Sequence, residues 1–404
     1  MATPKLRFKD FGEDWTAKKL SQVANLTSSK RVHLSDYVSE GIPFFRGKEI
    51  TELKSGIFPK DILYISKKQY EDFKEKFGAP QNNEILMTAV GTLANTYLIN
   101  TDFEFYFKDG NLIWFKDINA DPNFLMILLD ARKNDVLASA IGSTQKALTI
   151  ANLNKLIFNF PSNEEQTKIA SFFSAVDEKI NQLTQKHELL SQYKQGMMQK
   201  LFSQQLRFKA DDGNEFREWS NKTIGDVANI KRGASPRPIN DSKWFDDSSS
   251  IGWVRISDVS KSKKYLLQTE QYLSTLGIQK SRLVPKGNLI MSICATIGKP
   301  IYTGFDVCIH DGFVVFSELQ AIHEYAYYYL EYIEKNWYQY GQAGTQVNLN
   351  SDIVSNEAFP FPCLEEQTKI ANFLSAIDQK IDVVSEQLEQ AKLWKKGLLQ
   401  QMFV

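Results

Sequence analysis

The sequence has few cysteines, no long apolar run and no excess of charge of one sign. Its 404 residues include three cysteines, Cys294, Cys308 and Cys363, too few for a disulfide framework and consistent with a reducing compartment. Lys and Arg together number 48, as do Asp and Glu, so the net charge is zero. No apolar run approaches the ~20 residues of a membrane span, and the first residues do not resemble a signal peptide. We therefore expect a soluble, cytoplasmic protein with no membrane partner.

Sequence motifs of nucleotide and metal chemistry are also missing. The chain has no GxxxxGK[ST] phosphate loop, no GxGxxG after a strand, and no Asn/Asp-Pro-Pro-aromatic tetrapeptide of an amino-methyltransferase. Its four histidines, His33, His187, His310 and His323, are scattered, and the Cys308-x-His310 spacing is too short to begin a usual zinc site. We therefore expect no metal site and no catalysis by this chain alone.

A long internal repeat is the main positive feature. Residues 160–202 begin FPSNEEQTKIASFFSAVDEKI, and residues 361–403 begin FPCLEEQTKIANFLSAIDQKI, a constant 201 residues further along. Between residues 161 and 180, fourteen of twenty positions are identical to their counterparts. Repetition of this quality indicates a duplicated structural unit.

Each copy of the repeat predicts one long helix. Pro161 and Pro362 stand where a helix can begin, and paired acidic residues follow that suit the positive end of the helix dipole. Ten mostly apolar positions then recur at alternating spacings of three and four, which is typical of a coiled-coil seam. At about 1.5 Å per residue, each helix would span roughly 60 Å, far more than a globular domain needs. The seam positions are Ile169, Phe173, Val176, Ile180, Leu183, His187, Leu190, Lys194, Met197 and Leu201, and then Ile370, Leu374, Ile377, Ile381, Val384, Leu388, Ala391, Lys395, Leu398 and Met402.

Two ordinary amphipathic helices on separate local cores are the alternative. The matching polar interruptions at Lys194 and Lys395 instead favour a shared partner in a fixed register. We interpret His187 as a seam residue and not as a ligand.

Similarity between the two halves extends beyond the helices. Leu6-Arg7-Phe8-Lys9 recurs as Leu206-Arg207-Phe208-Lys209, and Trp15 recurs as Trp219. Weaker echoes link Val23-Ala24-Asn25 to Val227-Ala228-Asn229, Ile42–Arg46 to Ile251–Arg255, Glu84–Thr88 to Asn288–Ser292, and Thr144-Gln145 to Thr345-Gln346. We therefore expect a first globule over residues 1–158, a central spacer helix over 159–205, a second globule over 206–359 and a C-terminal spacer helix over 360–404.

Both globules have mixed patterns. In the first, residues 84–90, 96–100 and 112–116 predict strands, and residues 67–77 and 123–140 predict helices. In the second, strands are expected near 289–294 and 313–317, and a helix near 322–340. Its aromatic stripe, which we interpret as core, consists of Tyr325, Tyr328, Tyr329 and Tyr332.

The order of segments predicts how the helices pair. A parallel pair would require the second globule to carry the chain back some 60 Å, which is implausible for a compact fold. The predicted fold class is therefore α+β: two similar mixed α/β domains separated by a long antiparallel two-helix coiled coil, with a pseudo-two-fold axis. In this arrangement the chain finishes beside its own start.

The paired blocks PxxEEQTKIAxFxSAxDxKI and the LRFK…W starts of the two globules resemble the specificity (S) subunit of type I restriction–modification enzymes over essentially all 404 residues. The resemblance implies that each globule is a target-recognition domain for half of a split DNA sequence. It also implies that the helices set the spacing and dock two modification (methyltransferase) subunits, which restriction subunits then join. S-adenosylmethionine, ATP and Mg would belong to those partners, and adenine N6 would be methylated on a flipped base.

A protein with two different readers on a rigid spacer should recognise a bipartite, asymmetric target. For contacts with double-stranded DNA we expect loop residues with Arg, Lys, Asn or Gln side chains, because these groups anchor phosphates or read base edges. The candidates are Lys30, Arg31, Arg46, Lys48, Asn95, Thr144, Gln145 and Lys146 in the first globule, and Lys231, Arg232, Arg237, Arg255, Lys299, Gln346 and Asn348 in the second.

Other interpretations of these residues stay open. Each charged cluster could be a solvated surface, and Arg46 and Arg255 follow apolar runs and could be structural ion-pair partners. Because the net charge is zero, we expect the complex with methyltransferase subunits to bind DNA far better than the chain alone. The competing functions are a docking scaffold with two peptide-binding globules, or a relative that docks methyltransferases without reading DNA.

Overall fold

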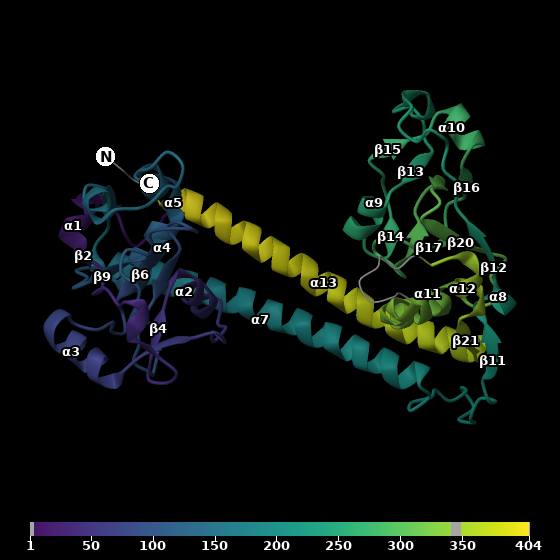
Figure 1. Cartoon of the computed structure of the whole chain (residues 1–404), viewed down its shortest axis with the longest axis horizontal. Coiled ribbons are helices and arrows are strands. Elements are labelled where there is room, and N and C mark those ends of the chain that lie inside the picture. The colour runs from purple at the N-terminus through teal and green to yellow at the C-terminus, as the bar shows by residue number, and fades with distance from the viewer. Residues whose placement is uncertain (1–3, 341–348, 404) are drawn as a thin grey trace. The chain divides into compact units, whose positions relative to one another are not determined.

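The computed structural model describes residues 4–340 and 349–403. The chain divides into two units, which Figure 1 shows: unit 1 is Met1–Thr184 with Gln387–Val404, and unit 2 is Gln185–Glu386. Both divisions fall inside the long helices, so each unit contains one globule and one end of each helix. None of the helices in the described ranges has the length and apolar content of a membrane span.

The globule of unit 1 is built on two small sheets. The first has the order β2-β9-β6-β7 and is antiparallel throughout, and the second has the order β3-β5-β4-β8, with β4 and β8 parallel. The strands are β1 (Thr16–Lys19), β2 (Asn25–Thr27), β3 (Tyr37–Val38), β4 (Ile42–Phe45), β5 (Leu63–Ile65), β6 (Ile85–Thr88), β7 (Thr96–Leu98), β8 (Tyr106–Phe107), β9 (Leu112–Lys116) and β10 (Ile157–Phe160), of which β1 and β10 form a separate pair. The short helices are α1 (Leu20–Val23), η1 (Leu34–Asp36), α2 (Gly47–Lys54), α3 (Lys67–Phe77), α4 (Pro122–Ala131), α5 (Lys133–Ala138) and α6 (Ile150–Leu153).

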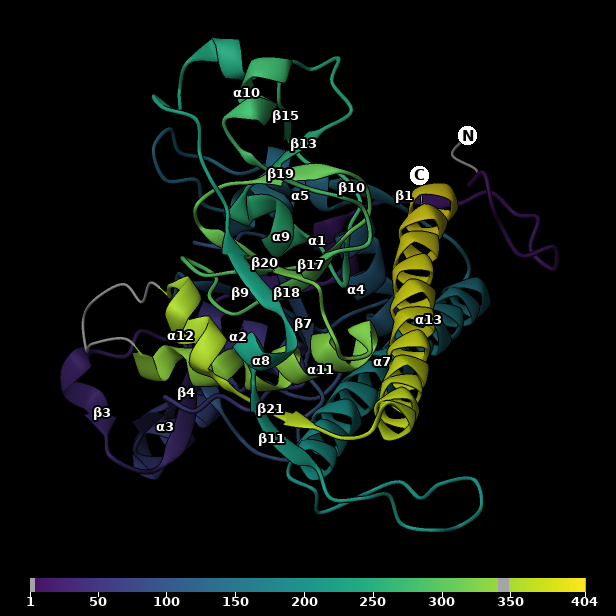
Figure 2. The ribbon, with the colours of Figure 1, turned by 90° about the vertical axis from the view of Figure 1, so that its right-hand side faces the viewer.

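Unit 2 repeats this plan, and Figure 2 shows it from the side of β11 and β21. Its first sheet, β12-β20-β17-β18-β14, contains the equivalent of the first sheet of unit 1, and its second has the order β15-β13-β19-β16. The strands are β11 (Ser220–Thr223), β12 (Asn229–Arg232), β13 (Gly252–Val254), β14 (Tyr265–Leu266), β15 (Gln271–Tyr272), β16 (Arg282–Val284), β17 (Leu289–Ser292), β18 (Pro300–Thr303), β19 (Val307–Ile309), β20 (Phe313–Ser317) and β21 (Ala358–Phe361). The short helices are α8 (Ile224–Val227), η2 (Ser242–Trp244), α9 (Ile256–Lys261), α10 (Thr275–Gln279), α11 (His323–Ile333), η3 (Glu334–Tyr340) and α12 (Ser351–Asn356).

Most elements predicted in the globules are present with small shifts. Helix α3 has the predicted bounds, because Ser66 caps its first turn by accepting the Gln69 N–H at 3.2 Å and Gly78 ends it at φ 83°. The helix predicted over 123–140 is instead broken into α4 and α5 at Arg132, which leaves helical geometry at φ −100° and ψ 26°. The helix predicted over 322–340 becomes 3-10 after Ile333.

The aromatic stripe on α11 is part of the core, as predicted. Tyr325, Tyr328 and Tyr329 are buried, and Tyr332 is half-buried and packs against the same core. Phe202, at the end of the central helix, packs against this stripe and stacks on Tyr332 with ring centroids 5.1 Å apart. The stripe therefore joins the second globule to the helix pair.

The two repeat copies form the predicted long helices, α7 (Asn163–Phe202) and α13 (Leu364–Met402). In unit 1, Phe173 near the start of α7 shares a core with Met402 at the end of α13. In unit 2, Leu201 near the end of α7 shares a core with Leu374 near the start of α13. The start of each helix thus lies beside the end of the other, which confirms the antiparallel pair. The alternative of separate local cores is wrong, because each core contains both helices and the globule.

Seam positions of both helices face inward. All twenty are buried or half-buried, including the two lysines and His187. Lys395 on α13 forms an ion pair with Asp177 on α7 at 2.5 Å in unit 1, and Lys194 on α7 forms one with Asp378 on α13 at 2.7 Å in unit 2. Each pair is the counterpart of the other 201 residues along the chain. The polar interruptions therefore find their partners on the opposite helix, which fixes the register of the pair.

The segment around Leu6 lies against the end of α13. The Leu6 N–H donates to the Gln401 carbonyl at 3.0 Å, and the Leu206 N–H donates to the Lys200 carbonyl at the end of α7 at the same distance. Leu6 is therefore placed after α13 in the way that Leu206 is placed after α7. The end of α13 therefore lies beside Leu6, as the predicted antiparallel path of the chain requires.

Candidate nucleic-acid interface

In unit 1, four loops meet at one end of the first sheet. The antiparallel order puts the end of β2, the β6–β7 turn and the start of β9 together there. Ser29 Oγ donates to the Phe107 carbonyl at 2.6 Å, and the Ala89 N–H donates to the Asn111 carbonyl at 2.8 Å. The Leu148 N–H donates to Ala89 at 2.9 Å and brings in the fourth loop. We call residues 28–33, 89–95, 108–111 and 141–147 loop cluster 1.

Loop cluster 1 contains six of the eight candidates in this globule. Arg31 is 70% exposed, and its Nε lies 3.2 Å from Asp109 Oδ2. Lys30 is exposed, with its ammonium 5.2 Å from the centroid of the Phe77 ring, and Asn95 donates to Thr51 Oγ1 at 2.9 Å. The other three are exposed neighbours in the fourth loop, Thr144, Gln145 and Lys146.

The remaining two candidates are at the start of α2, which contacts the cluster through Thr51. Arg46 forms an ion pair with Glu49, whose side chain is only 1% exposed, and its backbone N–H also donates to Glu49 at 2.8 Å. Burial raises the pKa of Glu49, but the hydrogen bonds from Arg46 outweigh it, and the pKa lies below its ordinary value. Arg46 therefore has the ion pair that its position after an apolar run suggested, and its contact with DNA stays a prediction. Lys48 is exposed, 3.7 Å from Glu52.

Within the described residues, unit 2 has counterparts of three of these loops at the equivalent end of its first sheet. The Gly233 N–H donates to the Phe313 carbonyl at 2.8 Å, and the Ile293 N–H donates to the Gly312 carbonyl at 2.9 Å. A Cβ at Gly233 would lie 2.0 Å from the carbonyl oxygen of His310, so only glycine allows this close approach. We call residues 231–238, 293–299 and 310–312 loop cluster 2.

Loop cluster 2 contains four candidates. Arg232 donates from Nε to the Asp311 carbonyl at 2.6 Å, and Arg237, 72% exposed, lies 3.1 Å from Asp311 Oδ2. Lys231 is exposed. Lys299 is half-buried and donates to the Ser262 carbonyl at 2.9 Å, and burial lowers the pKa of its ammonium.

The other three candidates in this globule lie outside loop cluster 2 as defined. Arg255 donates to Gln271 Oε1 at 2.7 Å, so its side chain has a neutral partner where Arg46 has a carboxylate. Gln346 and Asn348 lie outside the described residues. Their role in DNA contact stays a prediction, as it does for every candidate.

Each loop cluster contains one aspartate that pairs with an exposed arginine, and neither aspartate was among the predicted site residues. Asp109 and Asp311 each occupy an Asp-Gly turn directly before the central strand, β9 or β20, and each pairs with an exposed arginine from the loop after the first strand. The hydrogen bond from Ser235 Oγ, at 2.6 Å, holds the pKa of Asp311 below its ordinary value. The sequence could have indicated these two aspartates, because an Asp-Gly pair precedes the equivalent strand in both halves.

This arrangement suits contact with a polyanion. Guanidinium has five donors, and among the described residues the side chains of Arg31 and Arg237 each donate one bond, to Asp109 or to Asp311, so other donors can reach a phosphate or a base edge. Each carboxylate also limits the directions in which its arginine can point. Within the described ranges, no group of three or more His, Cys, Asp or Glu side chains is placed to hold a metal ion.

The long helices also carry large apolar side chains that face solvent. In unit 2, Leu189 and Tyr193 on α7 and Val383 on α13 are each more than half exposed. In unit 1, Leu393 and Trp394 on α13 are also more than half exposed. Exposed apolar groups gathered on a helix are typical of a protein-docking surface.

Comparison with known proteins gives consistent results along the whole chain. A family model described as "Type I restriction modification DNA specificity domain" matches residues 12–191 and 217–393. A putative type I restriction enzyme MjaX specificity subunit from Methanocaldococcus jannaschii is 24% identical, with 98% of this chain and 94% of that protein covered. The MjaVIII specificity subunit of the same organism is 24% identical, with 90% of each chain covered.

Two solved structures resemble the fold. The S subunit of a type I restriction–modification system from M. genitalium covers 100% of this chain and 99% of its own, with a TM-score of 0.59 and 18% identity. A chain from a study of complex assembly and conformational transition in the type I R-M system gives a TM-score of 0.63 at 18% identity, with 97% and 98% covered. At this identity the likeness concerns the fold alone.

Proposed function

Since the chain belongs to the type I restriction–modification DNA specificity family, we propose that it reads a bipartite, asymmetric DNA target with one half-site for each globule. The observation that carries the proposal is the duplicated loop cluster. At the same end of the same sheet, each unit presents an exposed arginine tethered to an Asp-Gly turn. The frame is shared, whereas the neighbouring side chains differ, so the two clusters suit two different base sequences.

Within each cluster we assign roles by chemistry. Arg31 and Arg237 have planar guanidinium groups that can form two parallel bonds with a guanine edge or a phosphate. Lys30, Lys146 and Lys231 are flexible point charges, which suit phosphate contacts that position the protein without reading sequence. Recognition is therefore the combined work of arginines that read and lysines that anchor.

We further propose that the chain acts as the non-catalytic subunit of a larger cytoplasmic complex. Two methyltransferase subunits would dock on the helix pair, where the exposed apolar side chains include Tyr193 in unit 2 and Trp394 in unit 1. The internal repeat supports two copies, because Tyr193 and Trp394 are counterparts 201 residues apart on the two helices. Restriction subunits would join through them, and S-adenosylmethionine, ATP and Mg would be bound by these partners.

Binding to random-sequence duplexes, with and without a co-expressed methyltransferase subunit, tests this function. We expect weak binding by the chain alone and much tighter binding by the complex. Arg31→Ala, Arg232→Ala and Arg237→Ala should each weaken binding and lower the slope of log K against log salt by about one for each lost phosphate contact.

Matched controls are Lys18→Ala and Lys222→Ala, which remove one positive charge from strands β1 and β11, outside the loop clusters. We expect the control variants to bind as the wild type does. Equal affinity and equal salt slope for the cluster variants and the wild type would contradict the assignment. Docking of methyltransferase without any DNA binding would instead support the scaffold function.

A further inference from the structure

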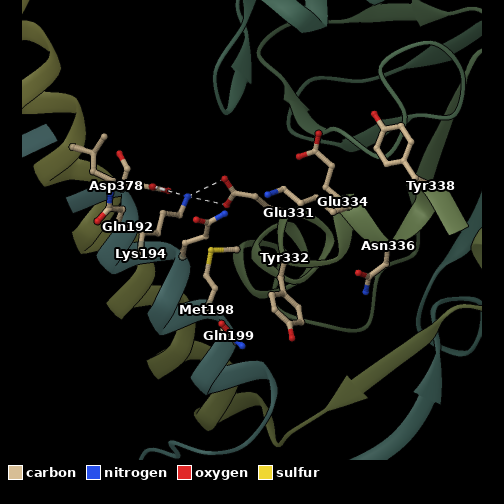
Figure 3. Close-up of a pocket in the computed structure, with 14 residues that line it drawn as sticks. Gln192, Lys194, Met198, Gln199, Glu331, Tyr332, Glu334, Asn336, Tyr338 and Asp378 are labelled. Atoms are coloured by element: carbon tan, nitrogen blue, oxygen red, sulfur yellow. Dashed lines mark hydrogen bonds and ion pairs between the residues drawn. The ribbon is translucent and has the colours of Figure 1, made fainter. Parts of the chain in front are cut away.

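Lys194 lies where three helices of unit 2 meet. Its Nζ is 2.8 Å from Glu331 Oε2 on α11 and 2.7 Å from Asp378 Oδ1 on α13, while Lys194 itself comes from α7. Figure 3 shows its ammonium between the two carboxylates. The side chain is only 12% exposed. One ammonium thus links the globule, through α11, to both long helices.

A second bond strengthens this link. The Tyr328 hydroxyl, also on α11, donates to Asp378 Oδ2 at 2.7 Å. Burial lowers the pKa of Lys194, but Glu331 and Asp378 more than offset this, so its pKa lies above the ordinary value and the group is charged at neutral pH. The ammonium is therefore a cation at physiological pH, whereas burial raises the pKa of its partner Glu331 above the ordinary value.

The start of α11 is held separately. Gln367, in the first turn of α13, accepts the Ile322 N–H at 2.8 Å. Glu331 is nine residues further along, or about 13 Å at the rise of an α-helix. One attachment leaves a helix free to pivot, but two attachments at this separation fix its direction. The two polar contacts therefore add a direction to the apolar packing of α11 on the helix pair.

Unit 1 has the first attachment but not the second. Gln166 accepts the Asp121 N–H at 3.0 Å, as Gln367 does in unit 2. The counterpart of Glu331, 201 residues earlier, is Asp130. Its carboxylate bonds within its own globule, to Lys54 at 3.1 Å and to Thr96 Oγ1 at 2.6 Å. In the described part of unit 1, Lys395 therefore pairs with Asp177 alone.

The Lys194 link borders open space. Glu331, Asp378 and Lys194 line a cavity of about 990 Å³ together with Met198 and Tyr332. Figure 3 shows these side chains around the space between α7 and the end of α11. The ion pairs therefore lie at the edge of the apolar core of unit 2, where the packing of α11 on the helix pair ends.

We propose that Lys194 is a positioning residue that fixes the angle of the second globule on the helix pair, and so sets the gap at which its half-site can be read. In the described part of the first globule, α4 has no ion pair with the long helices that corresponds to Glu331–Lys194, so we expect its angle on the helix pair to be less tightly set. This inference rests on the proposed bipartite reading of DNA. It states that the permitted gap between the half-sites depends on the Lys194 side chain as well as on the length of the helices.

Gap discrimination by the complex with methyltransferase subunits tests the proposal. Binding is measured on duplexes carrying the selected target with its native gap and with gaps one base pair longer or shorter. We expect Lys194→Met to discriminate against the altered gaps about tenfold less than the wild type, while its affinity for the native gap changes about twofold. Lys395→Met, the matched control, should discriminate as the wild type does.

Two further variants separate positioning from stability. Lys194→Arg keeps a cation between the two carboxylates and should restore discrimination. Glu331→Gln keeps the Lys194–Asp378 pair and replaces Lys194→Met if that variant does not fold. Unchanged gap discrimination in a folded Lys194→Met complex would overturn the proposal, even if its melting temperature fell.

Hydrogen exchange of the chain without DNA gives an independent result. We expect faster exchange in α11 for Lys194→Met and no change in α4 for Lys395→Met. If the wild-type complex bound no duplex at any gap, the proposed function would fail, whereas the exchange result would still decide whether Lys194 holds α11. Unchanged exchange in α11 would contradict the attachment itself.

Discussion

In unit 1, Arg7 donates two hydrogen bonds to the buried carboxylate of Glu165, both at 2.7 Å, and in unit 2, Arg207 donates two to Glu366, at 3.1 and 2.9 Å. The neighbouring glutamine reaches back to a proline carbonyl in each case and accepts an N–H from the globule. The arginine, glutamate and glutamine of each set come from the LRFK and EEQ sequences that the two halves share. The repeated residues therefore hold each globule to the start of a long helix.

Further along the helices the two units differ. Helix α11 presents tyrosines and Glu331 to the helix pair, whereas α4 is mainly aliphatic and its Asp130 bonds within the globule. The Lys–Asp pairs between α7 and α13 are nevertheless kept in both units. The residues that join α7 to α13 are thus the same in both units. The residues of α4 and α11, which pack each globule against the helices, differ between the units.

Loss of the arginine–glutamate pair that both units share should have the largest effect on the free energy of unfolding. Arg7→Met leaves the Glu165 carboxylate, 1% exposed, without its guanidinium, and we expect a loss of about 3–5 kcal/mol in the free energy of unfolding. Arg207→Met should cost about 1 kcal/mol less, because Trp219 Nε1 still donates to Glu366 at 2.8 Å. Urea unfolding followed by circular dichroism measures both losses.

Arg132→Met is the control for this pair of variants. Arg132 pairs with Asp135 on a partly exposed helix face, and its loss should cost at most about 1 kcal/mol. If Arg7→Met and Arg207→Met were no more destabilised than Arg132→Met, the arginine–glutamate pairs would not hold the globules to the helices.

A smaller difference in stability is expected between variants of Glu49 in unit 1 and of Asp258 in unit 2. Both are buried and both accept the backbone N–H of the arginine three residues earlier, at 2.8 Å, but only Glu49 also pairs with the guanidinium. We expect Glu49→Gln to cost about 2 kcal/mol at pH 7 and Asp258→Asn about 1 kcal/mol. Urea unfolding at neutral pH compares the two.

The cost of Glu49→Gln should also depend on pH. Because the pKa of Glu49 is depressed in the folded state, its stabilising contribution is complete above the ordinary carboxyl pKa of about 4.3 and is lost as the pH falls through the folded value. The difference between wild type and Glu49→Gln should therefore shrink on acidification. A difference that stayed constant or widened in acid would show that Arg46 does not stabilise the charged form.

The long helices were predictable because their signals are local and repeated. The seam spacing predicted α7 and α13, and the order of segments predicted their antiparallel pairing. The Asp109 and Asp311 pairs were not predicted, because they depend on which strands are neighbours, and the sequence does not state this order. The break at Arg132 was missed since neither proline nor glycine marks it. The bond from Lys194 to Glu331 was not predicted, because the two residues meet only through tertiary packing.

The central claim is that one chain presents two different readers. Selection from a random duplex library by the complex with methyltransferase subunits, followed by sequencing of the bound DNA, tests it most directly. The account predicts two short, dissimilar sequence blocks separated by a fixed stretch without preference. A single contiguous block, or two identical blocks, would contradict it.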